Sequence, residues 1–241
     1  MSRTRSERAS RAEATTGGAA IALDRVRVAV DGAVLLRDVS LELSAPRTAV
    51  IGANGSGKST FARLLNGLRP ITSGRIRVQG LDPRRDCAEL RRRVGFVFTN
   101  PEAQILMPTP AEDLALSLRD LPRHVRAEQV RTLLELYGLA EQGDVPVSAL
   151  SGGQRQLLAI AAVLATGPAL VVADEPTTLL DLRNSRRIGD LLLSLESPLV
   201  LVTHDLELAA RCDEVVLFEN GTVRSAGDPA SVIDEYRRSC A

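Results

Sequence analysis

A glycine-rich run near residue 55 has the residue types and spacing that hold phosphate groups. Residues 52–59 fit the pattern G-x-x-x-x-G-K-[ST] at every position. Glycines let backbone N–H groups turn toward phosphate oxygens, and a helix starting at the end of the run adds unpaired N–H groups. Lys58, the only lysine in the chain, can reach the β- and γ-phosphates, and the Ser59 hydroxyl can bind Mg²⁺. A plain glycine turn would show less of this pattern, so the run predicts a nucleoside triphosphate site.

Two carboxylates follow an apolar run at Leu170–Ala173. Asp174 can hold Mg²⁺ directly or through water, and Glu175 can polarise the attacking water as a general base. Hydrolysis spreads charge over the γ-phosphoryl oxygens, so positioning and electrostatics do most of the catalysis. An exposed acidic turn is the alternative, and the phosphate loop in the same chain favours the catalytic interpretation.

A histidine follows a second apolar run. A lone histidine is more often structural, but the carboxyl end of a parallel strand is where ligands bind in such sheets. His204 could there hydrogen-bond a γ-phosphate, whereas His124 lies in a polar stretch and is interpreted as a solvated residue.

The apolar runs predict the elements that position these residues. Continuous runs at Thr48–Ile51, Ala169–Ala173 and Pro198–Thr203 suit a parallel sheet covered on both faces. Further strands are predicted at 21–43 with a turn at 31–32, at 75–79, at 94–98, and in a hairpin of 215–218 and 222–224. We therefore expect an α/β domain over residues 19–241, preceded by a disordered tail at residues 1–18.

Helical patterns dominate between residues 100 and 165. Thr109 and Glu112 have capping-box spacing, and so do Ser151 and Gln154. These signals predict a helical subdomain inserted into the βα core at about residues 100–165.

Composition indicates what partners, membrane segments and cellular compartment to expect. The 30 basic and 30 acidic residues cancel, so the charge gives no indication of nucleic acid as a partner. The apolar stretch Leu157–Ala165 is far short of the roughly 20 residues of a spanning helix, so another chain would supply any membrane spans. Cys87, Cys212 and Cys240 form no close pair, which favours free thiols in the cytosol.

The run Leu150-Ser151-Gly152-Gly153-Gln154-Arg155 resembles the signature motif of ABC ATPases. The order also fits that family: phosphate loop, signature, acid pair, Asp181 and the histidine. Physically, Ser151 as N-cap and the two glycines would form a second anion-binding helix start.

The resemblance implies a P-loop NTPase (RecA-like) core with an antiparallel β-subdomain and a helical subdomain. In the family, the signature faces the γ-phosphate held by a second ABC ATPase domain, so two ATP molecules lie between two domains. The partner would be a second copy or a different chain, and Leu179-Leu180-Asp181 would cross the interface. Such a dimer closes on ATP and opens after hydrolysis.

The predicted activity is therefore ATP hydrolysis with Mg²⁺. Catalysis is assigned to Lys58, Glu175 and His204, and Mg²⁺ binding to Ser59 and Asp174. Contacts with ATP are expected from the phosphate loop and, across the interface, from the signature and the crossing loop: Gly52, Asn54, Gly55, Ser56, Gly57, Lys58, Ser59, Thr60, Ser151, Gly152, Gly153, Gln154 and Asp181.

Two positions depart from the family pattern. The family usually has a glutamine where this chain has Thr99; that glutamine normally reaches Mg²⁺ and water and links the site to the membrane partner. Gln104 lies nearby in sequence without a place in the site. An aromatic residue that stacks on adenine is replaced by Val30, with Val28 beside it, which leaves apolar contact with adenine but no stacking.

Within the family, Phe98–Gln104 resembles the ATPase subunits of energy-coupling-factor transporters, which import vitamins or transition-metal ions into prokaryotes. Residues 174–184 look most like the biotin type, with the cobalt and nickel types close. The implied partners are an integral membrane coupling protein and a substrate-binding membrane subunit, and the implied location is the cytoplasmic face of the cell membrane.

Two other interpretations stay open at this point. A soluble ABC ATPase would serve DNA maintenance, translation or cofactor assembly; the chain lacks the coiled-coil inserts of the first and the paired domains of the second. A catalytically silent regulatory domain is suggested by Thr99, but Lys58, Asp174, Glu175 and His204 argue against it.

Overall fold

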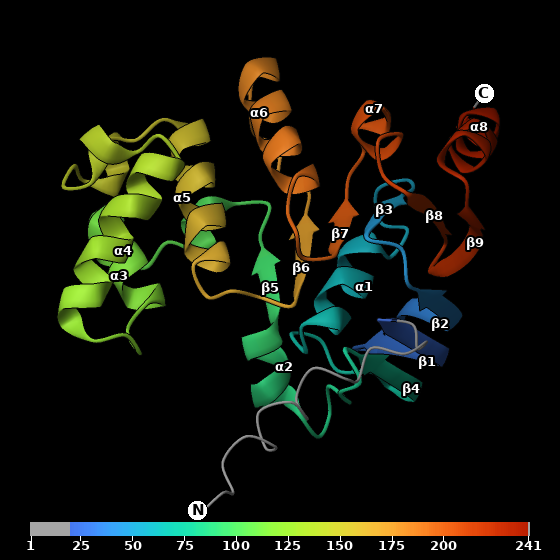
Figure 1. Cartoon of the computed structure of the whole chain (residues 1–241). Helices are drawn as coiled ribbons and strands as arrows, with labels where there is room; N and C mark the ends of the chain where they lie inside the picture. Colours follow the sequence, from blue (N-terminus) through green and yellow to red (C-terminus); the bar gives the residue numbers. More distant parts are fainter. Residues whose placement is uncertain (1–19, 241) are drawn as a thin grey trace, which may run out of the picture.

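The computed structural model describes residues 20–240, so the predicted tail at 1–18 lies outside the described residues. Two sheets and a lobe of helices make up this part of the chain (Figure 1). The sheets contain three and six strands, in the orders β2-β1-β4 and β5-β6-β7-β3-β8-β9.

The three-stranded sheet is antiparallel and comes mostly from the start of the chain. It contains β1 (Ile21–Val30), β2 (Ala33–Leu43) and β4 (Ser73–Val78). Asp31 and Gly32 both have positive φ, 50° and 81°, as a two-residue hairpin turn between twisted strands requires. The predicted strands and turn at 21–43 are thus confirmed.

The six-stranded sheet is parallel except at its last strand. It contains β5 (Val94–Val97), β6 (Leu170–Asp174), β7 (Leu199–Val202), β3 (Arg47–Ile51), β8 (Glu214–Glu219) and β9 (Thr222–Gly227), in spatial order. β9 returns antiparallel to β8 through the predicted turn at Asn220-Gly221. The central strands are almost wholly buried, which is why they are apolar on both faces.

Helices flank the sheet and form the separate lobe. They are α1 (Lys58–Leu65), α2 (Cys87–Arg93), α3 (Pro110–Ser117), α4 (Arg123–Leu136), α5 (Gly152–Leu164), α6 (Leu182–Leu193), α7 (Leu206–Ala209) and α8 (Pro229–Cys240). The helical lobe consists of α3, α4 and α5 (Figure 1). Three 3₁₀ turns lie at Pro101–Ala103, Ala140–Gln142 and Val147–Ala149. No helix between residues 20 and 240 is long and apolar enough to cross a bilayer.

The sequence patterns did not predict three of the helices, α2, α6 and α8. α2 buries only Leu90 and is otherwise rich in arginine, so it carries no apolar stripe to recognise. α6 buries Ile188 and Leu192 at helical spacing, whereas α8 buries two adjacent residues, Val232 and Ile233. Both helices carry several charged residues, so neither sequence shows a long apolar stripe.

The two faces of the parallel sheet belong to two separate cores. Val50, Val172 and Val202 pack with α1 and the antiparallel sheet on one face. Ile51 and Ala173 pack with α6 and the helical lobe, which includes α5, on the other. Because neighbouring residues of a strand point to opposite faces, each of the parallel strands contributes buried side chains to both cores.

Candidate functional site

The phosphate loop runs from the end of β3 to the start of α1, and its glycines have conformations that other residues avoid. Gly52, Gly55 and Gly57 have φ values of 139°, 78° and 109°. At Gly52 an added Cβ would also lie 2.2 Å from the Phe218 carbonyl oxygen. Another residue would therefore be strained at each of these positions, and at Gly52 it would also collide with the backbone.

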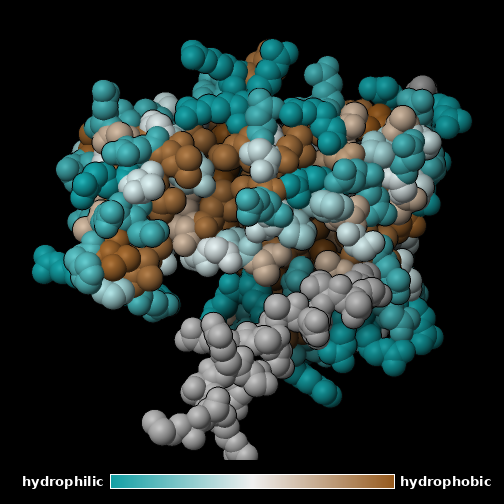
Figure 2. Space-filling view, in the orientation of Figure 1, coloured by the Kyte–Doolittle hydropathy of each residue, from teal (hydrophilic) through white to brown (hydrophobic). Residues whose placement is uncertain are grey.

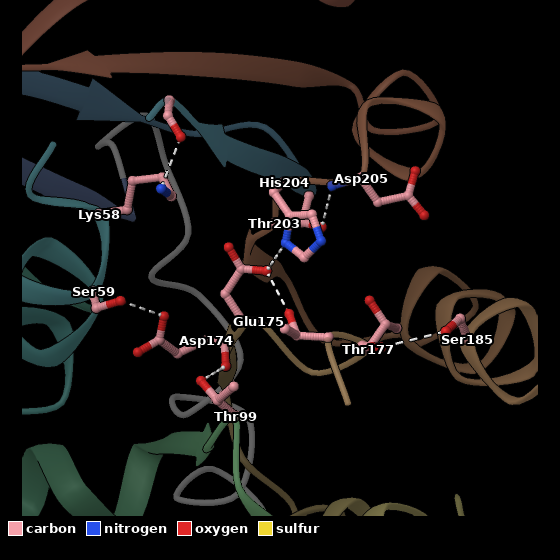
Figure 3. A network of polar contacts seen from close by, with 12 residues as sticks. Lys58, Ser59, Thr99, Asp174, Glu175, Thr177, Ser185, Thr203, His204 and Asp205 are labelled. Atoms are coloured by element: carbon pink, nitrogen blue, oxygen red, sulfur yellow. Dashed lines mark hydrogen bonds and ion pairs between the residues drawn. The ribbon is translucent and has the colours of Figure 1, made fainter. Parts of the chain in front are cut away.

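Polar groups of this loop are poised for an anion. The Lys58 side chain is only 6% exposed and folds back on the loop, where Nζ donates to the carbonyl oxygens of Gly52 and Ala53 at 2.8 and 3.0 Å (Figure 3). Burial lowers the pKa of Lys58, while Glu175 and Asp174 act in the opposite direction. The buried Ser56 hydroxyl has no hydrogen-bond partner among residues 20–240. A phosphate oxygen would satisfy both groups.

The carboxylate of Asp174 lies at the carboxyl end of β6, beside the start of α1. It is 2% exposed, and its Oδ1 accepts a hydrogen bond from the Ser59 hydroxyl at 2.9 Å (Figure 3). Arg63 lies 3.9 Å from the other oxygen. Burial raises the pKa of Asp174, against the hydrogen bond from Ser59 and the charge of Arg63. Such a buried carboxylate beside a hydroxyl suits a hard cation.

Glu175 and His204 come from neighbouring strands and meet side by side. Nδ1 of His204 lies 2.7 Å from Oε2 of Glu175, and the Thr178 hydroxyl donates to the same oxygen at 2.8 Å (Figure 3). Glu175 itself has a φ of 53°, in the left-handed region that few non-glycine residues adopt. The geometry brings together a carboxylate and an imidazole at the strand ends, next to the phosphate loop.

The signature residues lie elsewhere in this chain. Ser151 caps α5 and forms a complete capping box with Gln154, as predicted. Strands β6 and β7 separate β5, on which α5 packs, from β3 and its phosphate loop. Among residues 20–240, no hydrogen bond joins the start of α5 to that loop.

Asp181 lies at the start of α6, where it is the N-cap. Its carboxylate accepts from the backbone N–H and the side-chain amide of Asn184, both at 2.8 Å, and these bonds lower the pKa of Asp181. Asn184 in turn leaves no room for a side chain at Gly153, whose added Cβ would lie 2.6 Å from Cγ. Leu179 and Leu182, on either side, are 65% and 66% exposed. The start of α5 and the start of α6 are thus packed together through Asn184, and the exposed leucines lie beside them.

The two departures from the family pattern have clear positions. The Thr99 hydroxyl donates to the backbone carbonyl of Asp174 at 2.7 Å (Figure 3). Gln104 is occupied elsewhere, because it accepts from the Phe98 N–H and donates to the Ala159 carbonyl. Val28 is buried in the core between the sheets, so only the half-buried Val30 remains available for a base.

The sequence interpretation missed Thr178, Arg63 and the partner of Thr99. All three act through contacts between segments distant in sequence or through an unremarkable residue type. The three cysteines are free, and burial raises the pKa of Cys212 to about 11. Among the described residues no cluster of three or more His, Cys, Asp or Glu side chains is arranged to hold a metal alone.

The comparisons with known proteins agree with this geometry. The family model described as ABC transporter matches residues 36–178. An ABC transporter ATP-binding protein of Bartonella quintana is 43% identical over 90% of this chain and 97% of its own length. The biotin transport ATP-binding protein BioM of Rhizobium etli is 37% identical over 92% of this chain and 99% of its own length.

Solved structures share the fold. The cbiO1 protein of Clostridium perfringens, part of the ABC transporter complex cbiONQ, has a TM-score of 0.80 and 28% identity; the match covers 91% of this chain and 92% of that one. The ATP-binding cassette MJ0796, a dimer in a post-hydrolysis state bound to ADP and Pi, has a TM-score of 0.76 and 26% identity, covering 87% and 98%. The expected P-loop NTPase core with its two subdomains is thereby confirmed.

Proposed function

Since this chain belongs to the ABC transporter family and is an ATP-binding ATPase, we propose that it powers an energy-coupling-factor importer whose cargo is biotin. The observation that carries the catalytic part is the convergence of Lys58, Asp174 and Glu175 at one edge of the sheet. The cargo rests on the biotin transport relative, and the class of importer also rests on the likeness to cbiO1.

The phosphate loop binds the phosphates of ATP. Backbone N–H groups of the loop and the start of α1 surround the β- and γ-phosphates, and Lys58 leaves the Gly52 and Ala53 carbonyls to neutralise them. Ser56 gains the partner that it lacks. Ser59 and Asp174 would hold Mg²⁺, which supplies positive charge to the phosphate oxygens when bound.

Glu175 acts as the general base. Its carboxylate accepts a proton from the attacking water, and the bond between water oxygen and phosphorus forms as the bond to the β-phosphate oxygen breaks. His204, at 2.7 Å, orients that carboxylate and can donate to the γ-phosphate.

A second ABC ATPase domain completes the site. The start of α5, with Ser151, Gly152 and Gly153, is separated from this chain's own phosphate loop by strands β6 and β7, and it offers an anion-binding helix end. The exposed Leu179 and Leu182 would be covered by the partner. The dimeric MJ0796 structure supports this arrangement by analogy.

We further propose that a helix of the membrane coupling protein docks between the helical lobe and the rest of the chain. A groove of about 320 Å³ lies there, lined by residues of β5, α3 and α5. Leu68 and Leu106 border it with exposed side chains, and Figure 2 shows a notch beside the helical lobe with hydrophobic side chains next to it. This docking would hold the chain on the cytoplasmic face of the membrane.

Biotin uptake tests this function. Cells whose copy of this chain is deleted are expected to lose uptake of labelled biotin and to regain it with the wild-type chain, but not with Glu175→Gln. Loss of cobalt or nickel uptake instead would reassign the cargo. Unchanged uptake of all three would favour an ABC ATPase without a transport role.

A further inference from the structure

The peptide unit between Asp174 and Glu175 connects the proposed metal ligand to the proposed general base, and both of its polar groups are held. The Glu175 N–H donates to the Val202 carbonyl of β7 at 3.0 Å. The Asp174 carbonyl accepts from the Thr99 hydroxyl at 2.7 Å, on the opposite side. The two neighbouring segments thus clamp this unit from both edges.

The side chain of Thr99 replaces a strand-to-strand bond here. The pairing of β5 with β6 ends at Val97 and Ala173. Beyond that point the Phe98 N–H is taken by the side chain of Gln104. A hydroxyl one residue later therefore fixes a carbonyl that the β-ladder no longer reaches.

The clamp matters because the next residue is strained. Glu175 has a φ of 53°, and a non-glycine residue in this region costs on the order of 1–2 kcal/mol. Such a conformation persists only where its surroundings enforce it. Without the Thr99 bond, only the bond from the Glu175 N–H to the Val202 carbonyl would hold this peptide unit, and a rotation of the unit would turn the Glu175 carboxylate away from His204.

The same segment is tied to the helical lobe. Gln104 donates to the Ala159 carbonyl of α5 while it accepts from Phe98, and Gln156 of α5 approaches the Phe98 carbonyl at 3.5 Å. Thr99 is thus the last member of a chain of contacts from α5 to the acid pair.

We propose that Thr99 is a positioning residue for hydrolysis: its hydroxyl orients the peptide between Asp174 and Glu175 and so aims the general base. The proposal rests on the roles proposed above for those two carboxylates. It predicts that the hydroxyl itself is required, rather than the volume of the side chain.

Steady-state hydrolysis by the purified full chain tests this with two variants. Thr99→Val keeps the shape and removes the donor, so kcat is expected to fall about tenfold while ATP affinity stays within about twofold. Thr99→Ser keeps the donor and should retain kcat within about threefold of wild type. Thr132→Val is the matched control, because Thr132 also donates to a backbone carbonyl, that of Glu128 at 3.1 Å, within α4.

Two results would overturn the proposal: wild-type kcat in Thr99→Val, or a serine variant as slow as the valine variant. Glu175→Gln, measured in parallel, separates this from failure of the proposed function. An inactive Glu175→Gln with a fully active Thr99→Val refutes the role of Thr99 alone, whereas a fully active Glu175→Gln refutes the assignment of the base on which both rest.

Discussion

The phosphate-loop half of the site and the signature half differ in how completely this chain satisfies them. Lys58, Asp174 and Glu175 are buried or nearly so; Lys58 bonds to carbonyls of its own loop, whereas Asp174 and Glu175 bond to Ser59 and His204 on other elements. Ser151 and Gly152 are exposed, and Ser151 bonds only within its own helix start. We therefore expect the first half to bind a nucleotide alone, and the second half to function only when another domain presents one.

The largest expected effect tests the phosphate-loop half. Glu175→Gln removes the base but keeps the side-chain size, so turnover should fall by about 10²-fold or more while ATP binding persists. Hydrolysis and binding of a fluorescent ATP analogue measure the two properties. Turnover within a few-fold of wild type would remove Glu175 from its role.

The next effect tests the signature half. Ser151→Arg places a bulky cation where the other domain's γ-phosphate should lie, so turnover should fall at least about tenfold and ATP-dependent dimerisation should be lost. ATP binding by the monomer should stay unchanged, which separates the two halves. Ser151→Ala, which removes only the cap, should dimerise more readily than the arginine variant. Normal dimerisation of Ser151→Arg by light scattering would refute the two-domain site.

This contrast was partly predictable from sequence. The phosphate loop and the acid pair are each a short continuous run of sequence, so the residue types and spacing within each run predict which groups bind phosphate and Mg²⁺. The bond between Thr99 and the Asp174 carbonyl joins β5 to β6, and the contact between Gly153 and Asn184 joins α5 to α6. Neither leaves a local pattern, because each depends on which strands and helices are neighbours in space.

A smaller effect is expected where the signature meets α6. Gly153→Ala puts a Cβ 2.6 Å from Cγ of Asn184, which must move away from Asp181, so overpacking should destabilise the chain by about 1–3 kcal/mol. At Gly152 the nearest atom, Cδ2 of Leu180, is 3.9 Å away, so Gly152→Ala is the matched control for stability. Equal melting temperatures for both variants would show that the signature is not fixed to α6.

The smallest effect concerns stability without nucleotide. Burial raises the pKa of Asp174 above its ordinary value of 3.8, so the folded state binds its proton more tightly than the unfolded state. The free energy of unfolding therefore falls as the pH rises from the unfolded-state pKa through the higher folded-state pKa. Asp174→Asn should therefore raise the melting temperature at neutral pH by roughly 2–4 °C, the shift that about 1 kcal/mol produces in a chain of this size. The exposed Asp190→Asn should change it little. A lower melting temperature for Asp174→Asn would contradict the assigned cost of the buried charge.

Affinity purification of this chain from its native membranes, with mass spectrometry of what stays bound, tests the central claim most directly. We expect a coupling protein with several membrane spans and a small substrate-binding membrane subunit, both reduced when Leu106, 73% exposed at the edge of the groove, is changed to aspartate. Recovery of the wild-type chain with no membrane protein would contradict the proposed role in transport and leave an ABC ATPase that serves no transporter.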